Sequence, residues 1–142
     1  AAYAESVNGD KGTSATYSFD KSEMNGYIKY AIGSVTLGYQ QTYEDPGLRV
    51  NTGVQHYEAE AYGISFQVND NLSISYGEHN STQVNGTSAD VELETKGINA
   101  AYNIGGATLK FSHSEADNVN YTTGQGNLTD DTHTVIAIGM AF

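Results

Sequence analysis

The sequence predicts an all-β fold, a meander of antiparallel strands that run up and down. Two observations predict it: large apolar residues alternate with small or polar ones along most of the chain, and this pattern recurs at a fixed spacing. The composition agrees, because the 142 residues include 16 Gly and 11 Tyr but one Pro, no Cys and no Trp. Gly, Ser, Thr, Asn and Tyr favour strands and turns over helices.

The repeat is a hairpin. Three segments share a layout of strand, tight turn and strand: "GYIKYAIGSVTLGYQ", "AYGISFQVNDNLSISYG" and "INAAYNIGGATLKFS". Their turns fall near Gly33, Asp70 and Gly105, about 36 residues apart. Asn-Asp and Gly-Gly tolerate the positive φ that tight hairpin turns need. A recurring hairpin of this length is a meander.

The alternation predicts about eight strands in a single domain of residues 1–142, the first of them incomplete. They lie at residues 1–6, 27–32, 35–40, 62–68, 72–77, 98–104, 108–112 and 135–142. The turns at one end are short. The connections at the other end are long, polar and rich in acid, at roughly residues 7–23, 43–56, 79–92 and 115–132. Short turns on one rim and long loops on the other are the layout of a transmembrane β-barrel of the outer-membrane type.

Alternation alone leaves open whether the apolar face meets lipid or a protein core, as in a soluble β-sandwich or lipocalin-like barrel. Three features favour lipid. Aromatic residues on the apolar faces lie close to the short turns, where an interfacial girdle would be. The apolar stretches match a hydrophobic band of about 25 Å. The chain also ends inside its most apolar strand, "THTVIAIGMAF", which suits a strand that fills the membrane and stops.

This interpretation assigns candidate residues to each face. Those expected to face lipid or form the interface girdle are Tyr30, Tyr39, Tyr62, Phe66, Tyr76, Tyr102, Phe111 and Phe142. Those expected to line a pore are Lys29 and Lys110, supported by Tyr27, Thr36, Gln40, Ser65, Gln67, Ser73, Thr95, Asn99 and Ser112.

The end of the chain resembles a known signal. "VIAIGMAF", with Phe142 last and Ile136, Ile138 and Met140 at alternate positions before it, is similar to the assembly signal of Gram-negative outer-membrane proteins. With "YGISFQVNDNLSISYGEHN" and "GINAAYNIGGATLKFSHSEADN", nearly the whole chain resembles the C-terminal half of a general diffusion porin of the alphaproteobacterial type.

The resemblance implies a 16-stranded barrel, usually a homotrimer, in the outer membrane of a Gram-negative bacterium. It implies contact with outer-membrane lipid and lipopolysaccharide, and recognition of the C-terminal strand by the barrel assembly machinery. Porins of this family narrow their lumen with a loop from the N-terminal half, and no segment here matches that loop.

The residues on the face opposite the apolar one are informative about the size of the barrel. An eight-stranded barrel has an interior that side chains fill. Here that face is mostly Ala, Gly, Ser, Thr and Asn, and two lysines would lie inside with almost no acidic partner. This favours a wide, wet lumen and part of a 16-stranded barrel. A small eight-stranded outer-membrane barrel with a structural or adhesive role is the alternative, and a soluble ligand-binding β-barrel is the second.

The remaining chemistry is sparse. The net charge is −11 and the six basic residues are scattered, which excludes a nucleic-acid site. His56, His79, His113 and His133 are widely spaced and are expected to be solvated rather than to bind metal. "NLTDDTH" lacks the ligand spacing of a calcium loop.

No catalytic layout is apparent, so we expect no enzyme activity, cofactor or metal. We expect a water-filled channel for passive diffusion of ions and small hydrophilic solutes. The acidic outer loops predict a mild preference for cations.

Overall fold

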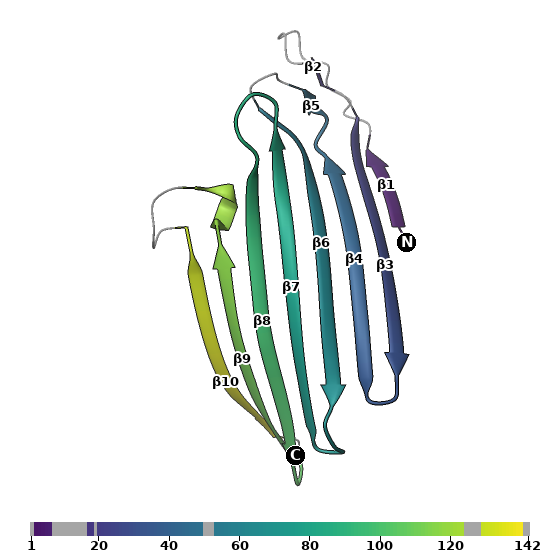
Figure 1. Cartoon of the computed structure of the whole chain (residues 1–142), viewed down its shortest axis with the longest axis vertical. Coiled ribbons are helices and arrows are strands. Elements are labelled where there is room, and N and C mark those ends of the chain that lie inside the picture. Colours follow the sequence, from purple (N-terminus) through teal and green to yellow (C-terminus); the bar gives the residue numbers. More distant parts are fainter. Residues whose placement is uncertain (1, 7–16, 19, 50–52, 124–128, 141–142) are drawn as a thin grey trace.

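The computed structural model describes residues 2–6, 17–18, 20–49, 53–123 and 129–140. These residues form an eight-stranded antiparallel sheet in which each strand pairs with the next one along the meander (Figure 1). Its strands, in spatial order, are β1 (Ala2–Ser6), β3 (Lys21–Ile32), β4 (Val35–Asp45), β6 (Val54–Gln67), β7 (Leu72–Asn85), β8 (Val91–Ile104), β9 (Ala107–Asp117) and β10 (Asp131–Met140). A separate ribbon pairs β2 (Tyr17–Ser18) with β5 (Leu48–Arg49). The all-β, up-and-down prediction is confirmed.

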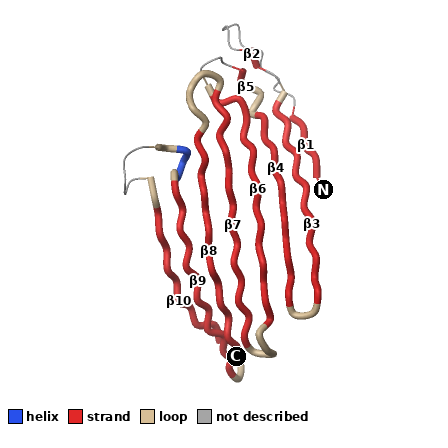
Figure 2. The backbone as a smooth tube through the Cα atoms, viewed as in Figure 1, coloured by secondary structure: helices blue, strands red, loops and turns tan. Residues whose placement is uncertain are grey.

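The short turns lie where the sequence predicts them, all at one end of the sheet (Figure 2). Gly33 and Ser34 join β3 to β4, and Gly105 and Gly106 join β8 to β9. The φ angles of the three glycines are 57°, 49° and 92°, the left-handed region that a side chain disfavours. In the turn between β6 and β7, the Asn69 side-chain oxygen accepts hydrogen bonds from the backbone N–H groups of Asn71 and Leu72, at 2.9 and 3.0 Å.

Of the four long connections expected at the other end, two are long, at residues 7–20 between β1 and β3 and 118–130 between β9 and β10, and the other two are shorter than expected. β7 continues to Asn85 and β8 begins at Val91, so a connection expected over residues 79–92 is reduced to residues 86–90. The stretch expected over residues 43–56 is similarly shortened by β4 and β6. The reason is that these polar segments still alternate and contain β-branched residues such as Thr82 and Val84. Their backbone groups pair across the strands, whichever solvent the side chains meet.

The sheet is open. Within the described ranges, the ladder of hydrogen bonds ends at β1 on one side and at β10 on the other, with no pairing between them. β1 covers only the stretch of β3 from Lys21 to Asn25. Side chains near these edges are correspondingly exposed: Ile28 is 68% and Ile136 is 70% exposed, against 44% for Ile64 in the middle of the sheet.

The sheet has no second layer within the described part of the chain. No hydrophobic residue there is buried, and large apolar residues of one face stay exposed, from 38% for Phe66 to 70% for Ile136. In the same ranges, no helix is long and apolar enough to span a membrane. What covers the apolar face must therefore come from outside these residues.

Candidate functional site

The register of the sheet assigns every strand residue to one of two faces. Directly opposed residues of an antiparallel pair project to the same side, and successive residues of a strand project to opposite sides. One such row crosses the sheet as Leu37, Ile64, Tyr76, Ile98, His113 and Thr134. We call the side with this row the apolar face. The neighbouring row is Thr36, Ser65, Ser75, Asn99, Ser112 and Val135, and we call its side the polar face.

The residues expected to meet lipid gather on the apolar face. Seven of the eight lie there by register: Tyr30, Tyr39, Tyr62, Phe66, Tyr76, Tyr102 and Phe111. Ile136, Ile138 and Met140 of the proposed assembly signal lie on the same face of the edge strand β10. Phe142 falls outside the described residues.

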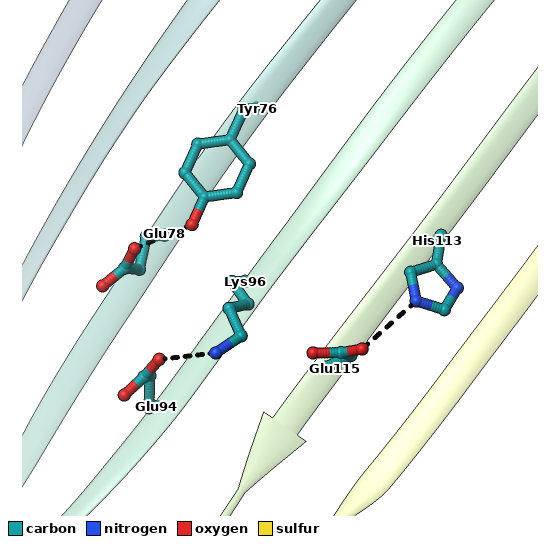
Figure 3. Close-up of polar contacts among 6 residues, drawn as sticks. All are labelled: Tyr76, Glu78, Glu94, Lys96, His113 and Glu115. Carbon is teal, nitrogen blue, oxygen red and sulfur yellow. Dashed lines mark hydrogen bonds and ion pairs between the residues drawn. The ribbon is translucent and has the colours of Figure 1, made fainter.

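Charged and hydrogen-bonded side chains bound the apolar face on the side away from the short turns (Figure 3). We call Glu78, Glu94, Lys96, His113 and Glu115 on β7, β8 and β9 the polar belt. The Tyr76 hydroxyl donates to the Glu78 carboxylate at 2.8 Å, and Lys96 pairs with Glu94 at 3.1 Å. The Nε2 atom of His113 lies 3.4 Å from Glu115. Because the Tyr76 hydroxyl bonds directly to Glu78, the surface changes from apolar to charged over two residues of one strand.

The height of the apolar band can be read along β6. Glu60 lies at its charged end and Val68 directly after the last residue of the strand, eight residues apart. At roughly 3.3 Å per residue this is ~26 Å along the strand, or ~20 Å of vertical height for a barrel tilt of ~40°. That height is close to the ~25 Å apolar band of outer-membrane barrels.

The polar face is hollowed. All eleven residues expected to line a pore lie on this face by register. A hollow of about 650 Å³ is lined in part by seven of them: Thr36, Ser65, Gln67, Ser73, Asn99, Lys110 and Ser112. A second hollow of about 390 Å³ is lined in part by Tyr27, Lys29 and Gln40. Thr95 lies on the same face, two residues before Gly97 on β8. Ser75, which was not singled out from the sequence, completes the serine-rich row.

A line of glycines helps to explain the second hollow. Gly38, Gly63, Gly77 and Gly97 are register neighbours on four consecutive strands. A Cβ atom at Gly63 would lie 3.3 Å from a backbone carbonyl oxygen of β7, and one at Gly97 would lie 3.2 Å from a carbonyl oxygen of β9. A side chain would therefore be crowded at Gly63 and Gly97, and the absence of side chains at Gly38 and Gly63 leaves space that belongs to the second hollow. The sequence shows the glycines, but only the register aligns them.

Charge is divided unevenly between the faces. Among the described strands, most carboxylates lie on the apolar face beyond the tyrosines, including Glu58, Glu60, Glu78, Glu92, Glu94, Glu115 and Asp117. The middle of the polar face carries Lys29 and Lys110. Nearer its long-connection end, Lys21 pairs with Glu23 and Glu44, and hydrogen bonds to these two carboxylates raise the pKa of the lysine. The cation preference expected from acidic loops stays a prediction, and most of these strand carboxylates face away from the hollows.

The four histidines do not converge. His56 and His113 lie on the apolar face, whereas His79 and His133 lie on the polar face. Three of them contact a carboxylate two residues away on their own strand: His56 with Glu58, His113 with Glu115 and His133 with Asp131. Across the described ranges, no group of three or more histidine and acidic side chains is placed to hold a metal ion.

Comparison of the chain with protein-family models, with curated proteins and with solved structures gives no match. The functional argument therefore depends on the two faces of the sheet.

Proposed function

We propose that this chain forms part of an outer-membrane porin, a water-filled channel for passive diffusion of ions and small hydrophilic solutes. The observation that carries the proposal is the division of one sheet into an exposed apolar face about as tall as an outer membrane and a hollowed polar face. Lipid would cover the first and water would fill the second. The C-terminal strand, with Ile136, Ile138 and Met140, would be recognised by the barrel assembly machinery.

The apolar face argues against a soluble ligand-binding barrel. Such a protein packs its apolar face on a second layer or into its own interior. Here Ile64, Ile98 and Ile138 are 44%, 48% and 69% exposed, and no hydrophobic side chain in the described part of the chain is buried. A contiguous apolar surface across seven strands is far larger than a soluble monomer tolerates. Lipid would cover this apolar surface without a second layer of protein.

The polar face favours a wide barrel over a small one. β1 and β10 are antiparallel to each other, so strand direction alone would allow them to close an eight-stranded barrel. An eight-stranded barrel, however, needs side chains that fill its interior. The glycine row and the serine-rich row leave hollows instead, and Lys29 and Lys110 would lie uncompensated in a dry plug. In a wide lumen of 16 strands, within a trimer, the same residues meet water.

The mechanism would be unassisted passage. Solutes would diffuse past small hydroxyl, amide and ammonium groups, with selectivity set by radius and by lining charge. Lys29 and Lys110 are the strongest charges in the middle of this wall, and they would lower the barrier to anions locally, whereas an acidic rim would favour cations.

Planar-bilayer recordings of the detergent-purified protein test the proposal. We expect discrete conductance steps, with no solute-specific saturation. Purified protein that gives no conductance after insertion would favour the structural or adhesive eight-stranded barrel. Protein that stays monodisperse in buffer without detergent would contradict the membrane assignment altogether.

A further inference from the structure

The connection that follows β9 turns back over the sheet. Its first residues form a short 3₁₀ turn, η1 (Val119–Tyr121), at the long-connection end (Figure 1). The Tyr121 hydroxyl lies 2.6 Å from the Ser81 hydroxyl on β7, and its ring lies 5.2 Å from the Tyr57 ring on β6. Ser81 and Tyr57 both belong to the polar face by register. Tyr121 therefore reaches past β8 and lies over that face.

The position of this segment is specified by several contacts. The Asn118 side-chain amide donates to the Glu92 carbonyl oxygen at 2.8 Å, and the Val119 N–H donates to the Thr129 carbonyl oxygen at 2.7 Å. Ser81 and Thr129 are the two polar side chains that are buried in the described ranges, at 5% and 4% exposure. Both of these buried side chains thus lie where this segment is attached to the sheet.

The backbone of the segment is strained. Asn118, Asn120 and Tyr121 have φ angles of 54°, 58° and 53°. Asparagine tolerates the left-handed region, but an aromatic residue seldom adopts it. Such strain persists only where surrounding contacts over-determine it, and it concentrates at functional sites.

Along β6, the polar face is bulky at this end and small in the middle. After Tyr57, its residues are Ala59, Ala61, Gly63 and Ser65, followed by Gln67 where the strand ends. Tyr57 and Tyr121 therefore form an aromatic pair at the rim, and the wall below them is built of small side chains. A passage along this wall is narrower at the pair than over the hollows.

We propose that Asn118–Tyr121 is a constriction at the long-connection end of the channel, and that Tyr121 sets the size limit for hydrophilic solutes. This inference rests on the proposed pore. It assigns the narrowing to the connection between β9 and β10, which lies in the part of the chain where no constriction was expected from the sequence. The Tyr121–Ser81 hydrogen bond stabilises Tyr121 in the position that narrows the channel.

The test compares the wild-type protein with Tyr121→Ala, Tyr121→Phe and Ser81→Ala in planar bilayers and in liposome swelling with sugars of increasing size. Tyr121→Ala is expected to raise single-channel conductance roughly 1.5- to 2-fold and to admit larger sugars, because both depend on the narrowest radius. Tyr121→Phe and Ser81→Ala each break the same hydrogen bond, so they are expected to give equal, smaller increases. Tyr39→Phe is the matched control, because it removes a hydroxyl that bonds Glu60 on the apolar face, and it should leave the conductance unchanged.

A second measurement does not depend on the folding of the tyrosine variants. The chain has no cysteine, so Thr122→Cys provides a single thiol at an exposed residue with extended backbone next to the turn. A bulky thiol reagent added to inserted channels is expected to reduce their current by at least about half. Two results would contradict the constriction while leaving the proposed pore intact. One is a wild-type conductance and sugar size limit equal to those of Tyr121→Ala, and the other is an unchanged current after labelling of Thr122→Cys. A wild-type protein with no conductance would instead refute the pore, and the constriction with it.

Discussion

A lysine placed in the middle of the apolar face should destabilise the membrane-inserted protein, whereas the same change one residue further along should not. Ile64 lies on the apolar face of β6 between Leu37 and Tyr76, and Ser65 lies on the polar face between Thr36 and Ser75. Ile64→Lys would put an ammonium group into lipid. Ser65→Lys would put it into water, beside a hollow that has room for it.

The magnitude follows from depth. Ile64 is four residues from Glu60 and four from Val68. At roughly 3.3 Å per residue and ~40° of tilt, it lies ~10 Å from each edge of the band. A lysine this close to the midplane of a barrel costs about 2–4 kcal/mol of folding free energy. That corresponds to a roughly 30- to 700-fold smaller folding equilibrium constant.

The assay is a denaturant titration of folding into lipid vesicles, with the free energies of Ile64→Lys and Ser65→Lys compared with that of the wild type. We expect a loss of about 2–4 kcal/mol for the first and less than about 0.5 kcal/mol for the second. Equal losses for the two variants, or a larger loss at Ser65, would refute the assignment of the faces.

Three further predictions concern the turns, the glycine row and the lining charges. Gly33→Ala should cost about 1–2 kcal/mol of unfolding free energy, because the residue has a φ angle of 57°; an unchanged denaturation midpoint would contradict this. Gly63→Val should cost about 1–3 kcal/mol because its Cβ atom would lie 3.3 Å from a carbonyl oxygen. Gly38→Val, with open space around it, should cost much less, and equal losses in vesicle refolding would count against the crowding. The double variant Lys29→Glu, Lys110→Glu should shift the reversal potential in a salt gradient toward cation selectivity. An unchanged reversal potential would contradict the assignment of these lysines to the pore lining.

The faces and the short turns could be predicted because their signals are local. Alternation over six or seven residues is sufficient to separate Ile64 from Ser65, and Gly33 or Gly105 marks a turn by its own conformational freedom. The strand ends could not be predicted, because a polar stretch such as residues 79–85 has the composition of a loop. It becomes a strand only when a partner strand satisfies its backbone groups.

Features that depend on register were beyond the sequence. The glycine row needs the alignment of four strands, although each glycine is visible in its own strand. The contact of Tyr121 with Ser81 joins residues 40 positions apart, and nothing near "NVNY" marks the segment as one that turns inward. Its left-handed backbone is a consequence of contacts that form only in the folded chain.

The central claim is that one face of the sheet meets lipid and the other meets water. The chain has no tryptophan, so Ile64→Trp and Ser65→Trp each introduce a single indole whose fluorescence reports one face. In vesicles, we predict strong quenching by brominated lipid chains and little by aqueous iodide for Ile64→Trp, and the reverse for Ser65→Trp. Equal quenching of both indoles by iodide, or of both by brominated lipid, would contradict the account.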